Sequence, residues 1–333
     1  MQTTTESQST TPLRVVTTYP FEPHEVERLR RAVSSRPLEI TIAKTPEEFR
    51  RELPNAEVVY GMVTGADLDQ APELKWVQSG AAGVEALDQK FRDSPVVLTN
   101  YATTFAPGIA ETAFGMLLCL TRGLSKYYVP QFLRREWKPV GTPKSPDHFE
   151  ISGTTMGIAG LGGIGRAVAR IAHDGFRMRV LATDARSSDK PEYVAELRDP
   201  SWFHEMAPRV DVLVAAAPLT PETERMFDER VFRSMKPAAY FLALSRGSLF
   251  DDLALVKALK EGWIAGAGLD VFPQEPPPPD HPIFDCPNVV MSMHTSGWGP
   301  NRQVRLIDTF AENLRRYDAG EPLMNVVDKT RGF

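Results

Sequence analysis

Residues 155–165 most limit what this chain can fold into. Their sequence, TMGIAGLGGIG, is typical of a buried strand that leads through a tight glycine turn into a helix. Gly160, Gly162 and Gly165 have the spacing G-x-G-x-x-G, in which the first glycine permits the turn and the third lets the helix pack closely on the strand. The run therefore predicts a parallel α/β sheet, because strands that alternate with helices pair in parallel.

Further strands are predicted after this run, at residues 179–183, 212–217, 240–245, 264–271 and 289–293. Their apolar runs are nearly continuous, which is typical of a parallel sheet with helices on both faces. Upstream, the apolar periodicity of residues 109–135 predicts one or two helices, and a polar loop follows at 139–146. These segments together predict a Rossmann-like domain over residues 108–301.

A smaller α/β unit is predicted before this domain, with strands at residues 13–18, 38–43, 56–63, 74–78 and 96–100. A helix at 23–33 separates the first two strands, so we expect parallel pairing here too. A last helix at 301–317 is expected to return to this unit. The fold class is therefore α/β with two parallel sheets. One sheet lies in the Rossmann-like domain, and the other lies in a flavodoxin-like domain over 13–107 and 302–333.

Composition excludes several classes of protein. The net charge is −5 and charges of both signs are mixed along the chain, so no basic stripe predicts binding to nucleic acid or to a membrane surface. No run of 18 apolar residues predicts a membrane span. Residues 1–12, rich in Thr, Ser and Gln, are expected to be a disordered tail. Two cysteines, Cys119 and Cys286, form neither a disulfide framework nor a metal site, so we expect a reducing, cytoplasmic setting and no metal.

The glycine run also predicts a dinucleotide site. Its second glycine lets the backbone approach a pyrophosphate, which would lie at the positive end of the following helix. The expected contacts are Gly160, Leu161, Gly162, Gly163, Ile164 and Gly165. The alternative is a turn that serves sheet-helix packing alone. The next strand ends in Asp184, about 20 residues on, where a ribose-binding acid belongs.

Asp184 also bears on which dinucleotide is bound. Its carboxylate would accept hydrogen bonds from the ribose 2′-hydroxyl and repel a 2′-phosphate, which favours NAD. Arg186 and Lys190 lie close by in the sequence and are the candidates for a 2′-phosphate if the cofactor is NADP instead.

Three later segments place chemically useful side chains after strands of the second domain. Arg246, Glu275 and His294 supply a cation, a carboxylate and an imidazole. Open α/β sheets bind ligands at the carboxyl ends of their strands. Reduction of a 2-oxo acid needs a cation to hold the carboxylate, a proton donor for the carbonyl oxygen, and an acid to orient that donor.

In its motifs and their order the chain resembles the D-isomer-specific 2-hydroxyacid dehydrogenases, including glyoxylate/hydroxypyruvate reductases and phosphoglycerate dehydrogenases. The resemblance extends from about residue 56 to 328 and rests on GLGGIG, AAPLTPET, LALSRGSLFDDLAL, AGLDVFPQEP and the His294 segment. One departure from the pattern is the turn at residues 173–178, which is one residue longer than usual.

The resemblance implies roles for individual residues. His294 would be the acid/base, Glu275 its partner and Arg246 the anchor of the substrate carboxylate, in a cleft between the two domains. Asp270 would meet the nicotinamide amide. Further cofactor contacts would come from Ala217, Pro218, Thr223, Leu244, Ser245, His294, Ser296 and Gly297.

In the first domain, residues 79–84 resemble the substrate loop of the family. The backbone N–H groups of Ala81, Ala82 and Gly83 would bind the substrate together with Arg246 and His294. An ordinary turn after a strand is the alternative. Residues 108–111 resemble the start of the interdomain helix. Candidate walls of the substrate pocket are Met62, Tyr101, Phe105 and Trp298.

The predicted function is hydride transfer between NAD(P) and a small D-2-hydroxy acid or 2-oxo acid, with glyoxylate or hydroxypyruvate taken from the breadth of the family. The resemblance also implies a homodimer, formed through residues 109–139. One alternative is a regulatory protein that senses NAD(H) without catalysis. Another is a family member acting on formate or phosphite, which Glu275 disfavours because the formate type pairs its histidine with an amide.

Overall fold

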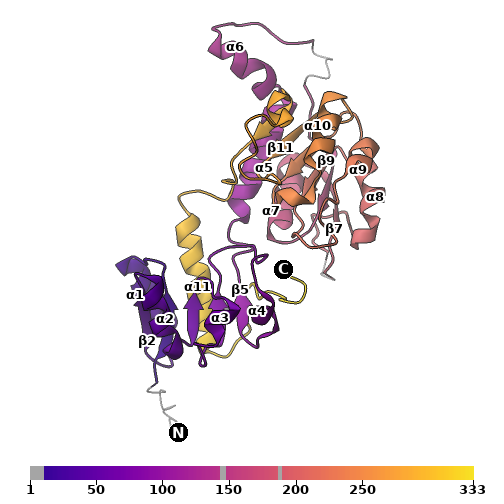
Figure 1. The fold of residues 1–333 in the computed structure, drawn as a ribbon. Coiled ribbons are helices and arrows are strands. Elements are labelled where there is room, and N and C mark those ends of the chain that lie inside the picture. Colours follow the sequence, from indigo (N-terminus) through magenta and orange to yellow (C-terminus); the bar gives the residue numbers. More distant parts are fainter. Residues whose placement is uncertain (1–10, 143–147, 187–189) are drawn as a thin grey trace, which may run out of the picture. The chain divides into compact units, whose positions relative to one another are not determined.

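The computed structural model describes residues 11–142, 148–186 and 190–333 (Figure 1). The predicted tail at 1–12 and loop at 139–146 therefore lie largely outside the described residues. The chain divides into two compact units. Unit 1 comprises residues up to Thr104 together with 300–333, and unit 2 comprises residues 105–299. None of the helices in the described ranges is long and apolar enough to cross a bilayer.

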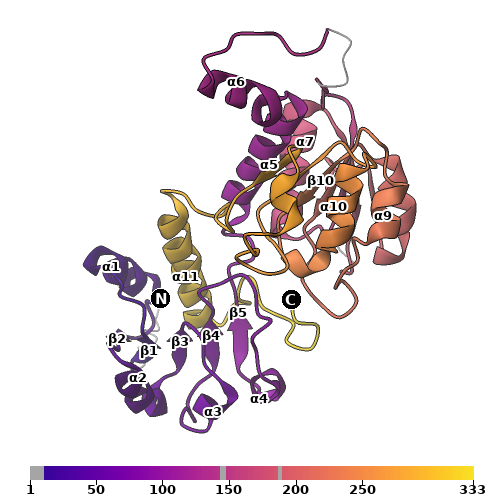
Figure 2. The same cartoon turned by 45° about the horizontal axis from the view of Figure 1, so that its top comes forward.

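Unit 1 is built on a five-stranded parallel sheet in the order β2-β1-β3-β4-β5 (Figure 2). The strands are β1 (Leu13–Thr17), β2 (Leu38–Ile42), β3 (Val58–Tyr60), β4 (Trp76–Gln78) and β5 (Val97–Thr99). All five lie within the predicted segments. The strand order reverses between β1 and β3, so the carboxyl ends of these two strands form the switch point of the sheet, where open α/β sheets take ligands.

The helices of unit 1 are α1 (Pro23–Ala32), α2 (Pro46–Glu52), α3 (Gly65–Leu68), α4 (Gln89–Asp93) and α11 (Arg302–Asp318), with a 3-10 turn, η1, at Leu53–Asn55. Helix α11 packs against α1 and runs alongside the strands (Figure 2). It buries Leu306, Phe310 and Leu314, which recur on one face at helical spacing. Helix α11 thus belongs to unit 1.

A buried polar network fastens α11 to the sheet. Asn313, Gln78 and Thr99 are each 0% exposed. The Asn313 amide donates to Gln78 Oε1 at 3.2 Å, and the Thr99 hydroxyl donates to the same oxygen at 2.8 Å. The Trp76 indole donates to Thr99 Oγ1 at 2.7 Å. Because buried polar groups are costly without partners, these contacts define how the helix sits on the strands.

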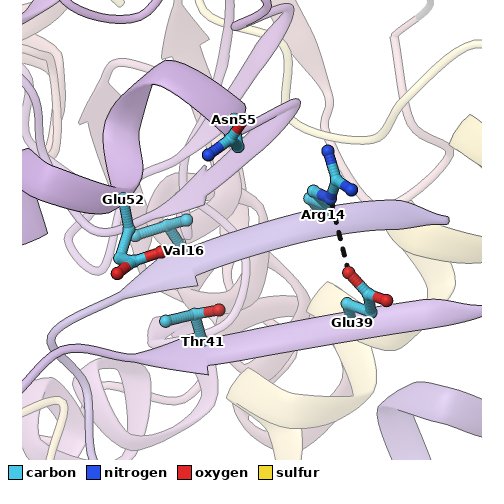
Figure 3. A pocket seen from close by; sticks show the side chains of 6 residues that line it. All are labelled: Arg14, Val16, Glu39, Thr41, Glu52 and Asn55. Carbon is cyan, nitrogen blue, oxygen red and sulfur yellow. Dashed lines mark hydrogen bonds and ion pairs between the residues drawn. The ribbon is translucent and has the colours of Figure 1, made fainter.

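The edge of the unit 1 sheet carries a hollow of about 220 Å³ (Figure 3). Arg14 of β1 pairs with Glu39 of β2 at 3.3 Å, and both side chains are about half exposed. Val16, Thr41, Glu52 and Asn55 complete the lining. An exposed ion pair of this kind contributes little to stability, and none of these residues belongs to a predicted site.

Unit 2 contains a seven-stranded parallel sheet in the order β12-β11-β10-β9-β6-β7-β8. The strands are β6 (Thr155–Ala159), β7 (Arg179–Thr183), β8 (Glu196–Arg198), β9 (Val212–Ala215), β10 (Tyr240–Ala243), β11 (Gly266–Leu269) and β12 (Val289–Met291). The order reverses between β6 and β9, as in a doubly wound dinucleotide-binding sheet. Parallel α/β architecture is confirmed for both units.

Helices cover both faces of this second sheet. They are α5 (Ala106–Thr121), α7 (Gly163–Phe176), α8 (Phe203–Met206), α9 (Glu229–Ser234) and α10 (Asp252–Lys260), whereas α6 (Val129–Leu133) buries none of its residues. Two apolar cores result, one containing α5 and α7 and the other containing α8, α9 and α10. The predicted helical stretch at 109–135 is divided because Gly123 adopts a left-handed conformation (φ +66°), after which a π turn, η2 (Leu124–Tyr128), leads into α6.

Candidate active site

The glycine turn joins β6 to α7 at the switch point of unit 2. Gly160 has φ +93°, and a Cβ there would lie 2.5 Å from the backbone of Ala217, in the segment after β9. A Cβ at Gly165 would lie 2.1 Å from the Gly160 carbonyl oxygen. At Gly162, the N-cap of α7, a Cβ would meet nothing within 4 Å. Packing therefore requires Gly160 and Gly165, whereas Gly162 borders open space at the positive end of a 14-residue helix.

Asp184 lies directly beside this turn. One carboxylate oxygen accepts the Leu161 N–H at 2.7 Å and the other accepts the Arg186 N–H at 2.7 Å. Each oxygen retains a second lone pair, so the group can still accept hydrogen bonds from ribose hydroxyls. The Lys190 ammonium donates to the Val194 carbonyl at 2.7 Å.

The longer turn at 173–178 leaves this geometry intact. Arg177 takes a left-handed conformation (φ +53°) that ends α7, and the Met178 N–H donates back to the Ala172 carbonyl at 3.0 Å. This closing pattern absorbs the extra residue at the helix end. Strand β7 then pairs with β6 over its whole length, so Asp184 follows the strand as its position in the sequence suggests.

Two hydroxyl groups shape the segment after β9. Ser245 Oγ donates to the Ala217 carbonyl at 2.8 Å, and Thr223 Oγ1 donates to the Pro218 carbonyl at 2.7 Å. Leu244 is buried (2% exposed) and its N–H donates to the Ala215 carbonyl at 3.1 Å. These residues thus hold the backbone beside the glycine turn.

His294 and Glu275 form a hydrogen-bonded pair. His294 Nδ1 lies 2.8 Å from Glu275 Oε2, and Glu275 Oε1 accepts the Phe272 N–H at 2.9 Å. A carboxylate on Nδ1 favours the tautomer in which Nδ1 carries the proton, so that Nε2 is the nitrogen that exchanges a proton with a ligand. The His294 side chain is 50% exposed, so it is accessible within unit 2.

Asp270 holds the loop that carries His294. It is 2% exposed, and its Oδ1 accepts hydrogen bonds from Ser292 Oγ at 2.7 Å, Thr295 N at 3.0 Å and Ser296 N at 3.1 Å. Ser296 Oγ donates to the other oxygen, and the His294 N–H donates to the Asp270 carbonyl at 2.8 Å. The sequence did not predict this network, whose only signal is an acid after one strand and hydroxyl residues after the next.

Arg246 follows β10, next to the strands that lead to the other two residues. Its Nη1 donates to the Ser245 carbonyl at 2.7 Å. A Cβ at Gly247 would lie 1.9 Å from the backbone of Phe272, so the Arg246 loop packs directly on the Glu275 loop. Because β10, β11 and β12 are parallel neighbours, Arg246, Glu275 and His294 come to one edge of the sheet, the edge that also bears the glycine turn.

The predicted substrate loop follows β4 in unit 1. Its carbonyls at Ala81 and Ala82 accept hydrogen bonds from Tyr101 N at 3.1 Å and Asn100 Nδ2 at 2.7 Å. The Ala81 N–H donates to Ser79 Oγ at 3.1 Å. Within the described residues the N–H groups of Ala82 and Gly83 have no acceptor, which suits them to bind a carboxylate.

The four candidate pocket walls differ in exposure. Met62 and Trp298 are 44% and 67% exposed and so are accessible in their own units. Phe105 lies close to Gly297, where a Cβ would come within 3.3 Å of the Phe105 side chain. Tyr101 is 0% exposed and donates its hydroxyl to the Leu306 carbonyl at 3.0 Å, so it is part of the core of unit 1.

The chain is similar to known proteins in sequence and in fold. Residues 114–296, more than half of the chain, match the family profile described as "D-isomer specific 2-hydroxyacid dehydrogenase, NAD binding domain". A glyoxylate reductase of Korarchaeum cryptofilum is 36% identical over 78% of this chain and 78% of its own length.

Solved structures agree. An NADPH-dependent glyoxylate/hydroxypyruvate reductase of Sinorhizobium meliloti, solved with NADP and sulfate, superposes with a TM-score of 0.77 at 26% identity, covering 96% of this chain and 99% of its own. A D-isomer specific 2-hydroxyacid dehydrogenase of Xanthobacter autotrophicus, solved with NADPH and MES, superposes with a TM-score of 0.78 at 24% identity over 96% and 99% of the two chains and supports the fold.

These matches show that the chain is an NAD(P)-dependent oxidoreductase of hydroxy acids, with a nicotinamide dinucleotide as cofactor. Nothing among them favours the regulatory alternative. The chain belongs to the D-isomer specific 2-hydroxyacid dehydrogenase family.

Proposed function

We propose that this chain reduces glyoxylate and hydroxypyruvate with NADH. The observation that carries the proposal is the His294–Glu275 pair, 2.8 Å apart, in loops at the sheet edge that also bears Arg246 and the glycine turn. The glyoxylate reductase similarity supports these substrates, since glyoxylate has the 2-oxo acid group that such a site recognises.

The residues have distinct roles in this proposal. Arg246 and the N–H groups of Ala82 and Gly83 bind the substrate carboxylate, because a planar guanidinium and backbone donors both match its two oxygens. His294 Nε2 donates a proton to the 2-oxo oxygen as that oxygen gains negative charge, and Glu275 stabilises the imidazolium. When bound, the cofactor supplies the hydride for carbon 2 of the substrate.

The cofactor preference follows from Asp184. A fixed carboxylate beside the turn would repel a 2′-phosphate and accept bonds from a free 2′-hydroxyl, which favours NADH. The alternative is NADPH, which the Sinorhizobium meliloti relative uses, and Arg186 is then the candidate partner for the 2′-phosphate. Initial rates measured with NADH and NADPH side by side distinguish the two.

The first test removes the triad one residue at a time. His294→Ala is expected to lower kcat on glyoxylate by about 10²–10⁴-fold with nearly unchanged affinity for NADH, because general acid catalysis is lost and the glycine turn is not touched. Arg246→Ala is expected to raise KM for the 2-oxo acid.

The control for both variants is His204→Ala, which alters an exposed histidine on α8. NADH affinity is measured by fluorescence titration beside the steady-state rates. Full turnover by the His294 variant, or an unchanged KM after Arg246→Ala, would contradict the roles assigned here.

The proposal extends to assembly and setting. Exposed apolar side chains gather on η2 and α6 and just beyond, at Leu124, Val129, Phe132, Leu133 and Trp137, and support a homodimer through this segment. Both cysteines are free, which suits the reducing cytoplasm.

A further inference from the structure

A second hollow of unit 1 lies at the switch point of its sheet. It has a volume of about 370 Å³ and is bordered by Thr18 and Tyr19 after β1, by Tyr60 and Gly61 at the end of β3, and by Arg302 at the start of α11. The crevice outside the carboxyl ends of strands, where the strand order reverses, is the place where open α/β sheets bind ligands. Position alone therefore makes this hollow a candidate site.

The lining of the hollow selects for an anion. Among the residues that border it, Arg302 is the only one with a charged side chain, and Thr18, Tyr19 and Tyr60 add hydroxyl groups. Charges from both sides reach this lining: burial raises the pKa of the Tyr60 hydroxyl and the Glu25 carboxylate adds to that rise, while the Arg302 guanidinium opposes it.

Two acids of unit 1, on α1 and α11, have partners of their own. Glu25 is 5% exposed and accepts the Gln303 amide at 2.8 Å and the Glu22 N–H at 2.9 Å. Asp308 pairs with Arg28 at 2.6 Å. No carboxylate borders the hollow in the part of the chain that the structure describes, so Arg302 supplies the one charged group of its lining.

The hollow adjoins the predicted substrate loop. Gly80, the second residue of that loop, borders it, and a Cβ at Gly80 would meet no atom within 4 Å. A ligand whose 1-carboxylate lies on the N–H groups of Ala82 and Gly83 would therefore have its side chain next to this space. Glyoxylate has no side chain and would leave it empty.

We propose that this hollow binds a second carboxylate, on the side chain of a 2-oxo dicarboxylic acid, and that Arg302 determines specificity for such substrates. Guanidinium and carboxylate match in a bidentate geometry, and the surrounding hydroxyls add donors. This inference rests on the proposed function, because it assumes that residues 79–84 hold the substrate carboxylate.

The test compares substrates with and without the second carboxylate. Rates are measured for glyoxylate, 2-oxobutyrate, oxaloacetate and 2-oxoglutarate, with wild type, Arg302→Met, Arg302→Lys and Arg51→Met. Arg51 is the matched control, since it is an exposed arginine of unit 1 outside the hollow. Arg302→Met is expected to lower kcat/KM for the preferred dicarboxylate about 10- to 100-fold, mainly through KM, while glyoxylate changes less than about 3-fold. Arg302→Lys should recover part of the loss.

The outcomes distinguish failure of the role assigned to Arg302 from failure of the proposed function. Reduction of glyoxylate together with rejection of every dicarboxylate overturns the role of Arg302 and leaves the proposed function standing. An equal loss on glyoxylate and the dicarboxylates after Arg302→Met also overturns it, because the residue would then serve a group that all the substrates share. Failure of wild type on every substrate would instead contradict the proposed function. Thermal melting of each variant shows whether its fold is kept.

Discussion

A methyl group at Gly162 would meet no atom within 4 Å, whereas at Gly165 it would come within 2.1 Å of the Gly160 carbonyl oxygen. The two glycines belong to one motif, but the structure needs Gly165 for packing and leaves open space beside Gly162. The motif already predicted this division, since it assigns packing on the strand to its third glycine and approach to a pyrophosphate to its second.

This difference predicts opposite behaviour for two single substitutions. Gly165→Ala is expected to destabilise the protein by about 1–3 kcal/mol, since the neighbouring backbone must move. Gly162→Ala is expected to melt within about 2 °C of wild type but to bind NADH more weakly, because its methyl group occupies the approach to the pyrophosphate. Calorimetric melting and NADH titration measure the two quantities.

Gly175→Ala is the control for both, because its methyl group would meet only Ile171, at 4.0 Å, within α7. It should be neutral or slightly stabilising. Normal NADH affinity in the Gly162 variant would show that this glycine does not contact the dinucleotide.

The catalytic candidates were predictable because each follows a strand with a clear apolar pattern. Arg246, Glu275 and His294 needed no three-dimensional information beyond the rule that parallel strands end at one edge. Asp270 differs, since its partners Ser292 and Ser296 lie 22 and 26 residues further along the chain. Such a network depends on the register between β11 and β12, which composition and periodicity do not show.

At the scale of elements, the predicted strands include every strand of the two sheets except the edge strand β8. Strand β8 was missed because it has three residues, two of them charged. Its Glu196 accepts bonds from Arg179, Arg198 and Arg209 at 2.6–3.1 Å. Side-chain pairing therefore supports an edge strand whose apolar pattern is too short to detect.

A second charged cluster joins three elements of unit 1. The Arg36 guanidinium donates two bonds of 2.9 Å to Glu57, just before β3, and the Tyr317 hydroxyl of α11 donates to Glu57 at 2.8 Å. Burial favours a raised pKa for the Glu57 carboxyl, but the bonds from Arg36 and Tyr317 outweigh it and lower that pKa. The folded state thus binds this proton less readily than the unfolded state.

The stability that Glu57 contributes is therefore fully present above its ordinary pKa, near 4.5, and is lost as the pH falls through the lower folded value. Glu57→Gln is expected to cost about 1.5–3 kcal/mol at pH 7, because Arg36 loses a charged partner. The difference in the free energy of unfolding between variant and wild type should narrow as the pH falls below 4.5. Urea unfolding at a series of pH values measures it, with Glu39→Gln, 59% exposed, as a control expected to change little. A gap that stays constant with pH would exclude this linkage.

At the scale of the whole molecule, the apolar segment from η2 to Trp137 has no core to join among the described residues. Phe132, Leu133 and Trp137 are 77%, 74% and 99% exposed. Large apolar side chains in such a group are typical of an interface. Apolar periodicity predicted a helical segment here but not its exposure, since it does not distinguish a core face from an interface face; the expectation of an interface came from the family resemblance alone.

A homodimer through this segment makes a direct prediction. Phe132→Glu combined with Leu133→Glu should reduce the solution mass from two copies to one, because burying two carboxylates in an apolar contact is costly. Light scattering after size exclusion measures the mass. Val304→Glu, at a residue 53% exposed on α11, is the control. An unchanged mass in the double variant, or a monomeric wild type, would exclude dimerisation through this segment.

The return of α11 to unit 1 has a consequence for synthesis on the ribosome. The five strands of the first sheet emerge early, but the helix that covers Trp76 and carries Asn313 is translated only after all of residues 105–299. At ordinary elongation rates this gap lasts roughly 10–40 s. Unit 2 can finish folding in that interval, while the earlier sheet waits with an apolar face exposed. The nascent chain is therefore most in need of chaperone protection at its oldest segment rather than its newest.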